Sequence, residues 1–302
     1  MILRPAIKIK PVQVQRQRLV RANVVQTIHK PVPAQVVVYN SPPFVTFSKL
    51  GKYGRIGNQL FQIAAAVGYS KKYNIPIRLP KWFCNYDKID YSSYFINKLD
   101  QSYDENLKVQ EYKEPKFSYT EIPKSNNPID LHGYFQSELY FKDYENVIRN
   151  YLKPEKFLID KINRKYSDLL TGNVCSIHIR RGDYVGSGTH FVCDLNYYND
   201  CIDLMKAIGI KKFLFFSDDI NWCKENFKGG GYYFSEDNNP IEDLFIMSMC
   251  KNNIISNSSF SWWASWLNEN PNKLILVPSK WFADTSTIKD YENIFTECMI
   301  RI

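Results

Sequence analysis

The second half of the chain alternates between short apolar runs and longer amphipathic stretches. The apolar runs predict strands at residues 174–179, 213–216, 232–234, 253–256 and 274–277. The stretches between them predict helices at about 196–208, 220–227, 241–250 and 259–268. Strands that alternate with helices at this spacing form a parallel sheet with helices on both faces. We therefore expect an α/β domain over residues 171–302.

The first half shows a similar but less regular alternation. Its apolar runs predict strands at 45–47, 75–79 and 131–135. Its amphipathic stretches predict helices at 58–74, 141–151 and 155–170. The tyrosine-rich segment 82–128 has no clear period, and little is assigned there. A second α/β domain over 46–170, joined to the other near residue 170, predicts a cleft between the two.

Residues 1–45 differ from the rest of the chain in composition and charge. They are rich in Val, Gln, Pro and Arg, and the prolines exclude a central strand. Residues 1–86 hold fourteen Lys or Arg and no acid, which leaves 25 basic residues against 31 acidic ones in the remainder. We expect a solvated basic extension over residues 1–45, with no nucleic-acid partner and with peripheral contact to a membrane left open.

Cysteine and histidine usage argues against a metal site and against disulfides. The seven cysteines are scattered without a C-x-x-C pair, and the chain has only four histidines. This pattern is typical of a reducing compartment. No apolar run approaches the ~18 residues of a membrane-spanning helix, and the N-terminus has no signal-peptide block. The sequence therefore predicts a cytoplasmic protein without a metal, and it leaves the oligomeric state open.

The most informative charged segment follows a predicted strand directly. It contains His178, Arg180, Arg181 and Asp183. Ligands of open α/β sheets lie beyond the carboxyl ends of strands, and arginine binds phosphate oxygens through two hydrogen bonds. The two arginines therefore predict a diphosphate site, with His178 and Arg180 on one side of the strand and Arg181 placed to brace Asp183. A purely structural arginine–aspartate pair and a chance Arg-Gly-Asp adhesion motif are the alternatives.

Two aspartates follow the next predicted strand. Asp218 and Asp219 come directly after the apolar run at 213–216. Aspartate is a preferred helix cap, so we expect one of the two to cap the helix that follows. A carboxylate can accept two hydrogen bonds from the N1–H and the amino group of guanine, and the other aspartate is the candidate for that contact. No D-x-D triplet occurs in the chain, which weakens the idea of a metal-bridged nucleotide.

Two polar turns open predicted helices. Ser258, Ser259 and Ser261 lie where a helix begins, and helix N-termini bind phosphate. A serine cap without a ligand is the alternative there. Asn58 and Gln59 follow a glycine loop and offer amides to a sugar or to its leaving phosphate. Taken alone this loop is ordinary, because a G-x-x-G pattern is weak.

Taken together, four segments resemble the α-1,2-fucosyltransferases of glycosyltransferase family 11. The segments are GRIGNQLFQ (54–62), HIRRGDY (178–184), FSDD (216–219) and ISNSSFSWWASWL (255–267). The ordered set is specific, and the resemblance covers roughly residues 45–302. It implies a GT-B architecture, in which two Rossmann-like domains face a central cleft. It also implies inverting, metal-independent transfer of L-fucose from GDP-β-L-fucose to the 2-hydroxyl of a galactoside.

The resemblance assigns expected roles to residues of these segments. Arg180 is implied as the leading ligand of the diphosphate, and one of the two aspartates as the contact of guanine. The donor-binding residues that it implies are His178, Arg180, Arg181, Asp218, Asp219, Ser258, Ser259, Ser261 and Gln59. The catalytic residues that it implies are Arg180, Asp183 and Asn58. A general base for the acceptor hydroxyl stays open, because Asp183 could serve only to orient Arg181.

The sequence also leaves alternative functions open. One is another GDP-fucose-dependent fucosyltransferase, with a protein acceptor or a different linkage. A second is a non-catalytic module that binds a nucleotide or a glycan. A third is a nucleic-acid binder that uses the basic N-terminus, whose binding would depend on salt. The expected partners are GDP-fucose and a galactose-containing glycan, and no further cofactor is expected.

Overall fold

The computed structural model describes residue 39 and residues 41–302. The predicted basic extension, residues 1–45, lies outside the described residues except at Tyr39 and residues 41–45. Residues 39–302 belong to one compact unit. Across this described part of the chain, no helix combines the length and the apolarity needed to cross a membrane.

The larger of the sheets is built from the second half of the chain and is entirely parallel. Its strands are β6 (Val174–Ile179), β7 (Lys212–Ser217), β8 (Tyr232–Phe234), β9 (Asn252–Ile254), β10 (Ile275–Val277) and β11 (Met299–Arg301). Their order in the sheet is β11-β10-β9-β6-β7-β8. The direction of this order reverses between β6 and β9, and open α/β sheets bind ligands at such a switch point. The five predicted strands are confirmed, and β11 is an addition.

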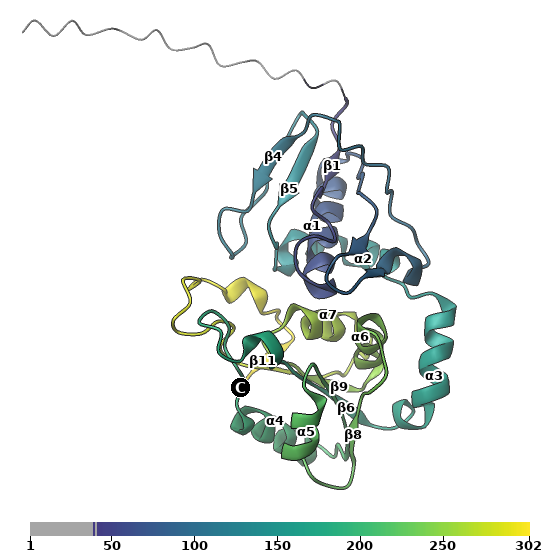
Figure 1. Ribbon diagram of the computed structural model, residues 1–302, viewed down its shortest axis with the longest axis vertical. Helices are drawn as coiled ribbons and strands as arrows, with labels where there is room; N and C mark the ends of the chain where they lie inside the picture. The colour runs from purple at the N-terminus through teal and green to yellow at the C-terminus, as the bar shows by residue number, and fades with distance from the viewer. Residues whose placement is uncertain (1–38, 40) are drawn as a thin grey trace, which may run out of the picture. The chain divides into compact units, whose positions relative to one another are not determined.

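Helices cover both faces of the larger sheet, as predicted. In Figure 1, α4 (Leu195–Ala207) and α5 (Ile220–Asn226) lie on one face. The opposite face is covered by α6 (Pro240–Met249) and α7 (Ser259–Leu267), on the side toward α1 (Ile56–Tyr73). The residues of β7 alternate between two buried clusters, with Phe213 in one and Leu214 in the other. This strict alternation explains why the strand is apolar along its whole length.

The smaller sheet belongs to the first half and is also parallel. Its strands are β1 (Val45–Thr46), β4 (Gln110–Lys113) and β5 (Ile129–His132), in the order β1-β5-β4. The predicted strand at 75–79 is wrong in extent, because only Ile77 forms a bridge, to Val45. Pro76 has no N–H to donate to a ladder. The predicted strand at 131–135 ends early, at His132, and Phe135 beyond it adopts a positive φ of 51°.

Short elements connect the larger ones. Within 82–128 the chain forms β4 and a small antiparallel pair of β2 (Phe83–Cys84) and β3 (Ile89–Asp90). The predicted helices before residue 171 are confirmed as α1, α2 (Glu145–Tyr151) and α3 (Lys156–Leu170). The 3-10 turns are η1 (Tyr91–Tyr94), η2 (Glu138–Tyr140), η3 (Lys142–Tyr144), η4 (Gly182–Tyr184) and η5 (Glu292–Ile294). The predicted boundary near residue 170 falls between α3 and β6.

The N-termini of α1 and α7 meet closely. A Cβ atom placed on Gly57, in the first turn of α1, would lie 2.5 Å from the backbone nitrogen of Phe260 in the first turn of α7. Any side chain at position 57 would therefore separate the two helices. The close approach joins the glycine loop of the first half to the polar turn of the second, so two helix N-termini lie beside the switch point of the larger sheet.

Candidate functional site

A cleft of about 630 Å³ lies between elements of the two halves. Its walls come from the loop before α1, the η4 turn after β6, the turn before α7 and the start of α6. The predicted site residues that line it are Asn58, His178, Arg180, Asp183, Asp218, Ser258 and Ser259. The predicted residues that do not line it are Gln59, Arg181, Asp219 and Ser261. The structure therefore brings seven predicted residues together around one cavity.

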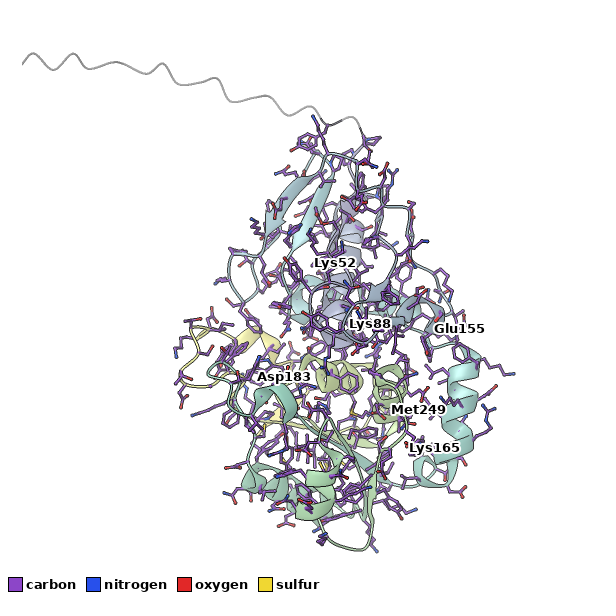
Figure 2. The ribbon with its side chains drawn as sticks, viewed as in Figure 1. Lys52, Lys88, Glu155, Lys165, Asp183 and Met249 are labelled. Atoms are coloured by element: carbon purple, nitrogen blue, oxygen red, sulfur yellow. The ribbon has the colours of Figure 1, made fainter. Side chains whose placement is uncertain are left out.

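Arg180 is held at the end of β6 by two carboxylates. Its guanidinium lies 2.5 Å from Asp183 Oδ1 through Nη2 and 3.0 Å from Asp218 Oδ2 through Nη1. The guanidinium also lies 5.4 Å from the centre of the Tyr184 ring. Asp183, labelled in Figure 2, belongs to the η4 turn. Its side chain is 63% exposed. The predicted brace between Arg181 and Asp183 is therefore wrong, because Asp183 pairs with Arg180.

We call Arg180 with its partners Asp183 and Asp218 the arginine corner. Arg181 is not part of it. Its Nε is 3.3 Å from Asp219 Oδ2, and its guanidinium packs 4.0 Å from the centre of the Trp222 ring. Asp219 caps α5 by accepting a hydrogen bond from the backbone N–H of Trp222. Asp218 accepts one from the backbone N–H of Arg181. The expectation that one of the two aspartates caps the helix is confirmed for Asp219, and Asp218 is the one that lines the cleft.

His178 is buried and neutral beside the arginine corner. Its Nδ1 lies 2.9 Å from the hydroxyl oxygens of both Ser256 and Ser261. Burial, followed by the nearby charge of Arg180, lowers the pKa of His178 to about 3. The ring therefore adds a hydrogen-bonding group to the cleft wall and no charge. Ser261 serves to orient this ring from behind the wall.

Asn58 connects the two halves across the cleft floor. Its Oδ1 accepts a hydrogen bond from Ser259 Oγ at 2.6 Å and another from Gln136 Nε2 at 2.8 Å. Ser258 caps α7 by accepting a hydrogen bond from the backbone N–H of Phe260. Asn58 and the serine turn thus hold the two helix N-termini in register.

Gln59 has a structural position instead. Its side chain is fully buried, donates to the carbonyl of Gly54 at 2.8 Å and accepts from Trp82 Nε1 at 2.8 Å. Its amide is therefore committed to the shape of the glycine loop. The described residues contain no group of three or more His, Cys, Asp or Glu side chains placed to hold a metal ion.

Comparison with known proteins identifies the family. The model of the family named Glycosyl transferase family 11 matches residues 54–298, which is most of the chain. The chain belongs to glycosyl transferase family 11. The predicted resemblance is therefore confirmed, and this family 11 chain is a glycosyltransferase.

Relatives of this family 11 chain have names that describe an activity. An Escherichia coli alpha-1,2-colitosyltransferase is 31% identical over 264 residues, covering 76% of this chain and 90% of the relative. A putative galactoside 2-alpha-L-fucosyltransferase of Caenorhabditis elegans is 25% identical over 291 residues, covering 84% of this chain and 77% of the relative. The match to the Escherichia coli O-antigen biosynthesis glycosyltransferase WbnK, at 34% identity, spans 54% of this chain and only 58% of that relative's length.

The fold is shared with solved fucosyltransferase structures. The crystal structure of POFUT1 in complex with GDP-fucose aligns with a TM-score of 0.53 and 13% identity, covering 79% of this chain and 99% of that chain. At this identity the likeness concerns the fold alone. It confirms the predicted GT-B architecture for this member of family 11.

The structure also places residues in the family 11 cleft that the sequence did not single out. Asp243 lines the cleft from the start of α6. Its Oδ1 accepts hydrogen bonds from Ser235 Oγ at 2.7 Å and from Asn238 Nδ2 at 3.1 Å. Burial raises the pKa of Asp243 to about 6. An acid in the first turn of a helix is common, so no signal in the sequence distinguished it.

Aromatic residues of the first half also line the cleft. Tyr86 is 61% exposed and Tyr134 is 43% exposed, and both belong to the lining. The pKa of Tyr134 is raised, first by burial and then by the nearby side chains of Tyr86 and Tyr53. Tyr53 is 42% exposed. Little could be assigned to 82–128 from the sequence, because its irregular pattern does not show which tyrosine rings face a cavity.

Proposed function

We propose that this family 11 chain transfers L-fucose from GDP-β-L-fucose to the 2-hydroxyl of a galactoside, with inversion and without a metal. The observation on which the proposal depends is the position of Arg180. It lies at the switch point of a parallel sheet, in a cleft bordered by two helix N-termini. Such a corner is suited to a leaving nucleoside diphosphate.

The arginine corner supplies positive charge where the reaction creates negative charge. As the sugar leaves, charge builds on the β-phosphate of GDP, and fixed donors stabilise it in a site of low dielectric. Asp183 pairs with one edge of the Arg180 guanidinium. Asp183 is largely exposed, so an incoming diphosphate can displace it into water at small cost. The N-termini of α1 and α7 add partial positive charge on the same side.

Asp243 is the residue that fits guanine in this proposal. The expected contacts were Asp218 or Asp219, but Asp219 caps α5, and Asp218 is engaged by Arg180 and by the backbone of Arg181. Asp243 lines the same cleft beside the apolar side chains of Phe216 and Pro240. A buried carboxylate that already accepts from neutral donors can also accept the N1–H and amino group of a purine. The aromatic ring of Phe216 in the same lining suits a face of the base.

The tyrosine wall suits a sugar acceptor. The exposed rings of Tyr86 and Tyr134 line the cleft from the first half of the chain. The turns at η4 and before α7, which we propose to bind the donor, belong to the second half. Flat aromatic faces pack against the apolar side of a pyranose, while the hydroxyl offers a hydrogen bond. A galactoside lying on this wall would present a hydroxyl to the sugar held at the arginine corner.

A donor screen tests the proposal directly. The full chain is incubated with lactose and, in parallel, with GDP-fucose, GDP-colitose, GDP-mannose and UDP-galactose, and nucleotide release is measured. We expect release from GDP-fucose and a product whose NMR spectrum shows an α-1,2 linkage. Release without transfer to any sugar, or a protein-only acceptor, would contradict the proposal.

A colitosyl donor is the second candidate. The relative that matches over 90% of its own length is an alpha-1,2-colitosyltransferase, so its name favours a 3,6-dideoxy sugar. The two donors share the nucleotide and differ in one hydroxyl of the sugar. The same screen separates them by the ratio of kcat/KM for GDP-fucose and GDP-colitose.

A further inference from the structure

His190 is a loop residue that lines the cleft and packs against two aromatic rings. It lies between η4 and α4 and lines the cavity. Its ring stacks on that of Tyr184, with centroids 4.1 Å apart and an angle of 5° between the planes. Tyr184 packs in turn beneath the guanidinium of Arg180. The imidazole is therefore connected by one ring to the corner that we assign to the diphosphate.

The other side of His190 is also fixed. Its backbone forms a bridge with Phe282, and the Phe282 ring lies 6.3 Å from the imidazole at an angle of 29°. Its backbone N–H donates to Ser187 Oγ. No side chain or backbone group among the described residues hydrogen-bonds to the imidazole nitrogens of His190, whereas Nδ1 of His178 contacts two serines. The ring is thus oriented by stacking and leaves its nitrogens for a ligand.

The surroundings of His190 keep its imidazole neutral. Partial burial lowers its pKa, and the charge of Arg180 lowers it further, while Asp183 acts in the opposite direction. These two charged groups both come from the segment around η4. The two rings that stack on the imidazole, those of Tyr184 and Phe282, carry no charge. A neutral imidazole beside an arginine can accept a proton at ordinary pH.

We propose that His190 is the catalytic base that takes the proton from the acceptor hydroxyl. This inference rests on the proposed function. The acceptor oxygen forms a bond to the anomeric carbon on the face opposite the diphosphate, and the bond from that carbon to the β-phosphate oxygen breaks. The electron pair of the broken bond stays on GDP, beside Arg180. The hydroxyl proton moves to a nitrogen of His190, which later releases it to water.

The other candidate bases in the cleft are occupied by protein partners. The pairs are Asp87 with Tyr91, Asp183 and Asp218 with Arg180, Asp243 with Ser235, and His178 with Ser256. A donor or a cation beside a carboxylate stabilises its unprotonated form and so weakens it as a base. The imidazole nitrogens of His190 have no such partner among the described residues.

Two substitutions distinguish proton transfer by His190 from its packing against Tyr184. H190F keeps a flat ring against Tyr184 but has no nitrogen, and H190Q keeps polarity but cannot act as a base. General bases contribute on the order of 10²–10⁴ in rate, so we expect both variants to lose at least about 10²-fold in kcat. GDP affinity, measured by calorimetry, should be unchanged in both because the arginine corner is intact. Free imidazole should restore part of the activity of H190A.

The pH dependence of kcat distinguishes a base from a residue that serves only in packing, because packing alone would not change it. An imidazole accepts a proton only when it is neutral, so wild-type kcat should fall as the pH drops through its pKa. This acid limb should be missing in H190Q. The profile is measured with donor at saturation, because Asp243 titrates near pH 6 and would otherwise affect donor binding.

Two results would overturn the role of His190. One is an H190F protein with wild-type kcat and an unchanged acid limb. The other is an H190A protein that loses activity and GDP affinity together and does not respond to imidazole, which would indicate a structural residue. Failure of the wild-type protein to transfer sugar from any donor would contradict the proposed function instead.

Discussion

The two halves of the described chain line the cleft with different kinds of structure. The half from β6 onward places its cleft residues at the ends of buried parallel strands, as with Arg180 after β6 and Asp218 after β7. The half before it lines the same cleft mainly from loops, such as the one that contains Tyr86. A regular sheet fixes charged groups to within a narrow range of positions, whereas loops can vary in sequence without changing the core.

This difference suggests that the second half mainly binds the nucleotide and the first half mainly binds the acceptor. The nucleotide is a constant feature of the donor, so its contacts benefit from rigid strand ends and helix N-termini. The acceptor is the variable partner, and the tyrosine wall of the first half is the part that could be altered without disturbing the donor site. The comparison predicts that substitutions in the two halves will affect different kinetic parameters.

The largest effect is expected for Arg180→Ala. The variant removes the cation at the switch point and leaves Asp183 and Asp218 unpaired, so it should lose on the order of 10²–10³ in kcat. Activity is measured with GDP-fucose and lactose, and the thermal midpoint is recorded to show that the fold persists. Arg301→Ala is the matched control, because Arg301 pairs with Glu292 on the surface at β11. Equal activities of the two variants would remove Arg180 from the mechanism.

A smaller effect is expected for Asp243→Asn, and it should appear in donor binding. An amide cannot accept from both donors of guanine, and an unmet hydrogen bond costs about 1–3 kcal/mol, or roughly 10- to 100-fold in affinity. Calorimetry with GDP measures the change. The charged carboxylate is the form that accepts, so wild-type GDP affinity should fall as the pH drops through about 6, the raised pKa of Asp243, and the variant should not show this dependence.

Asp203→Asn provides the control for this experiment. Asp203 is an exposed carboxylate on α4 that pairs only loosely with Lys206. Its variant should bind GDP as the wild type does at every pH. Because the pKa of Asp243 is raised to about 6, its carboxyl group changes charge mainly between about pH 5 and 7. A wild-type GDP affinity that stays constant over this range would rule out Asp243 as the guanine contact.

The two halves also differ in how much of them could be predicted. The strands β6 and β7 were predictable because a strand buried on both faces is a continuous apolar run. The strand β4 was not, because Gln110–Lys113 is polar and mostly exposed at a sheet edge. The short β1 was found through its apolar residues, but Pro76 reduced its neighbour to a single bridge.

Within the site, sequence position predicted which residues approach the cleft better than it predicted their partners. Alternation along β6 placed His178 and Arg180 on one side, and both line the cleft. The pairing of Asp183 with Arg180 instead of Arg181 depends on the conformation of the η4 turn, which no period in the sequence encodes. Asp243 reaches the cleft only because α6 packs against the larger sheet, and such tertiary placement is not a local property.

A moderate effect on the acceptor side is expected for Tyr86→Ala. Loss of one stacked ring costs about 0.5–1.5 kcal/mol, so the KM for a galactoside should rise roughly three- to tenfold. The KM for GDP-fucose should not change, because Tyr86 is not among the residues proposed to contact the donor. Tyr233→Ala is the matched control, since Tyr233 is 41% exposed on β8 and does not line the cleft. An equal rise in both variants, or a rise in donor KM, would contradict the division between the halves.

The smallest effect is expected for deletion of residues 1–40. The buried core of the described chain begins at Phe44 and Val45, and the described residues that line the cleft start at Gly54. We therefore expect the truncated protein to keep the kcat/KM and thermal midpoint of the full chain. Binding to vesicles of anionic lipid, measured for both proteins, tests whether the basic residues removed here serve a surface contact instead. Loss of activity or a lower thermal midpoint would show that the extension is part of the catalytic body.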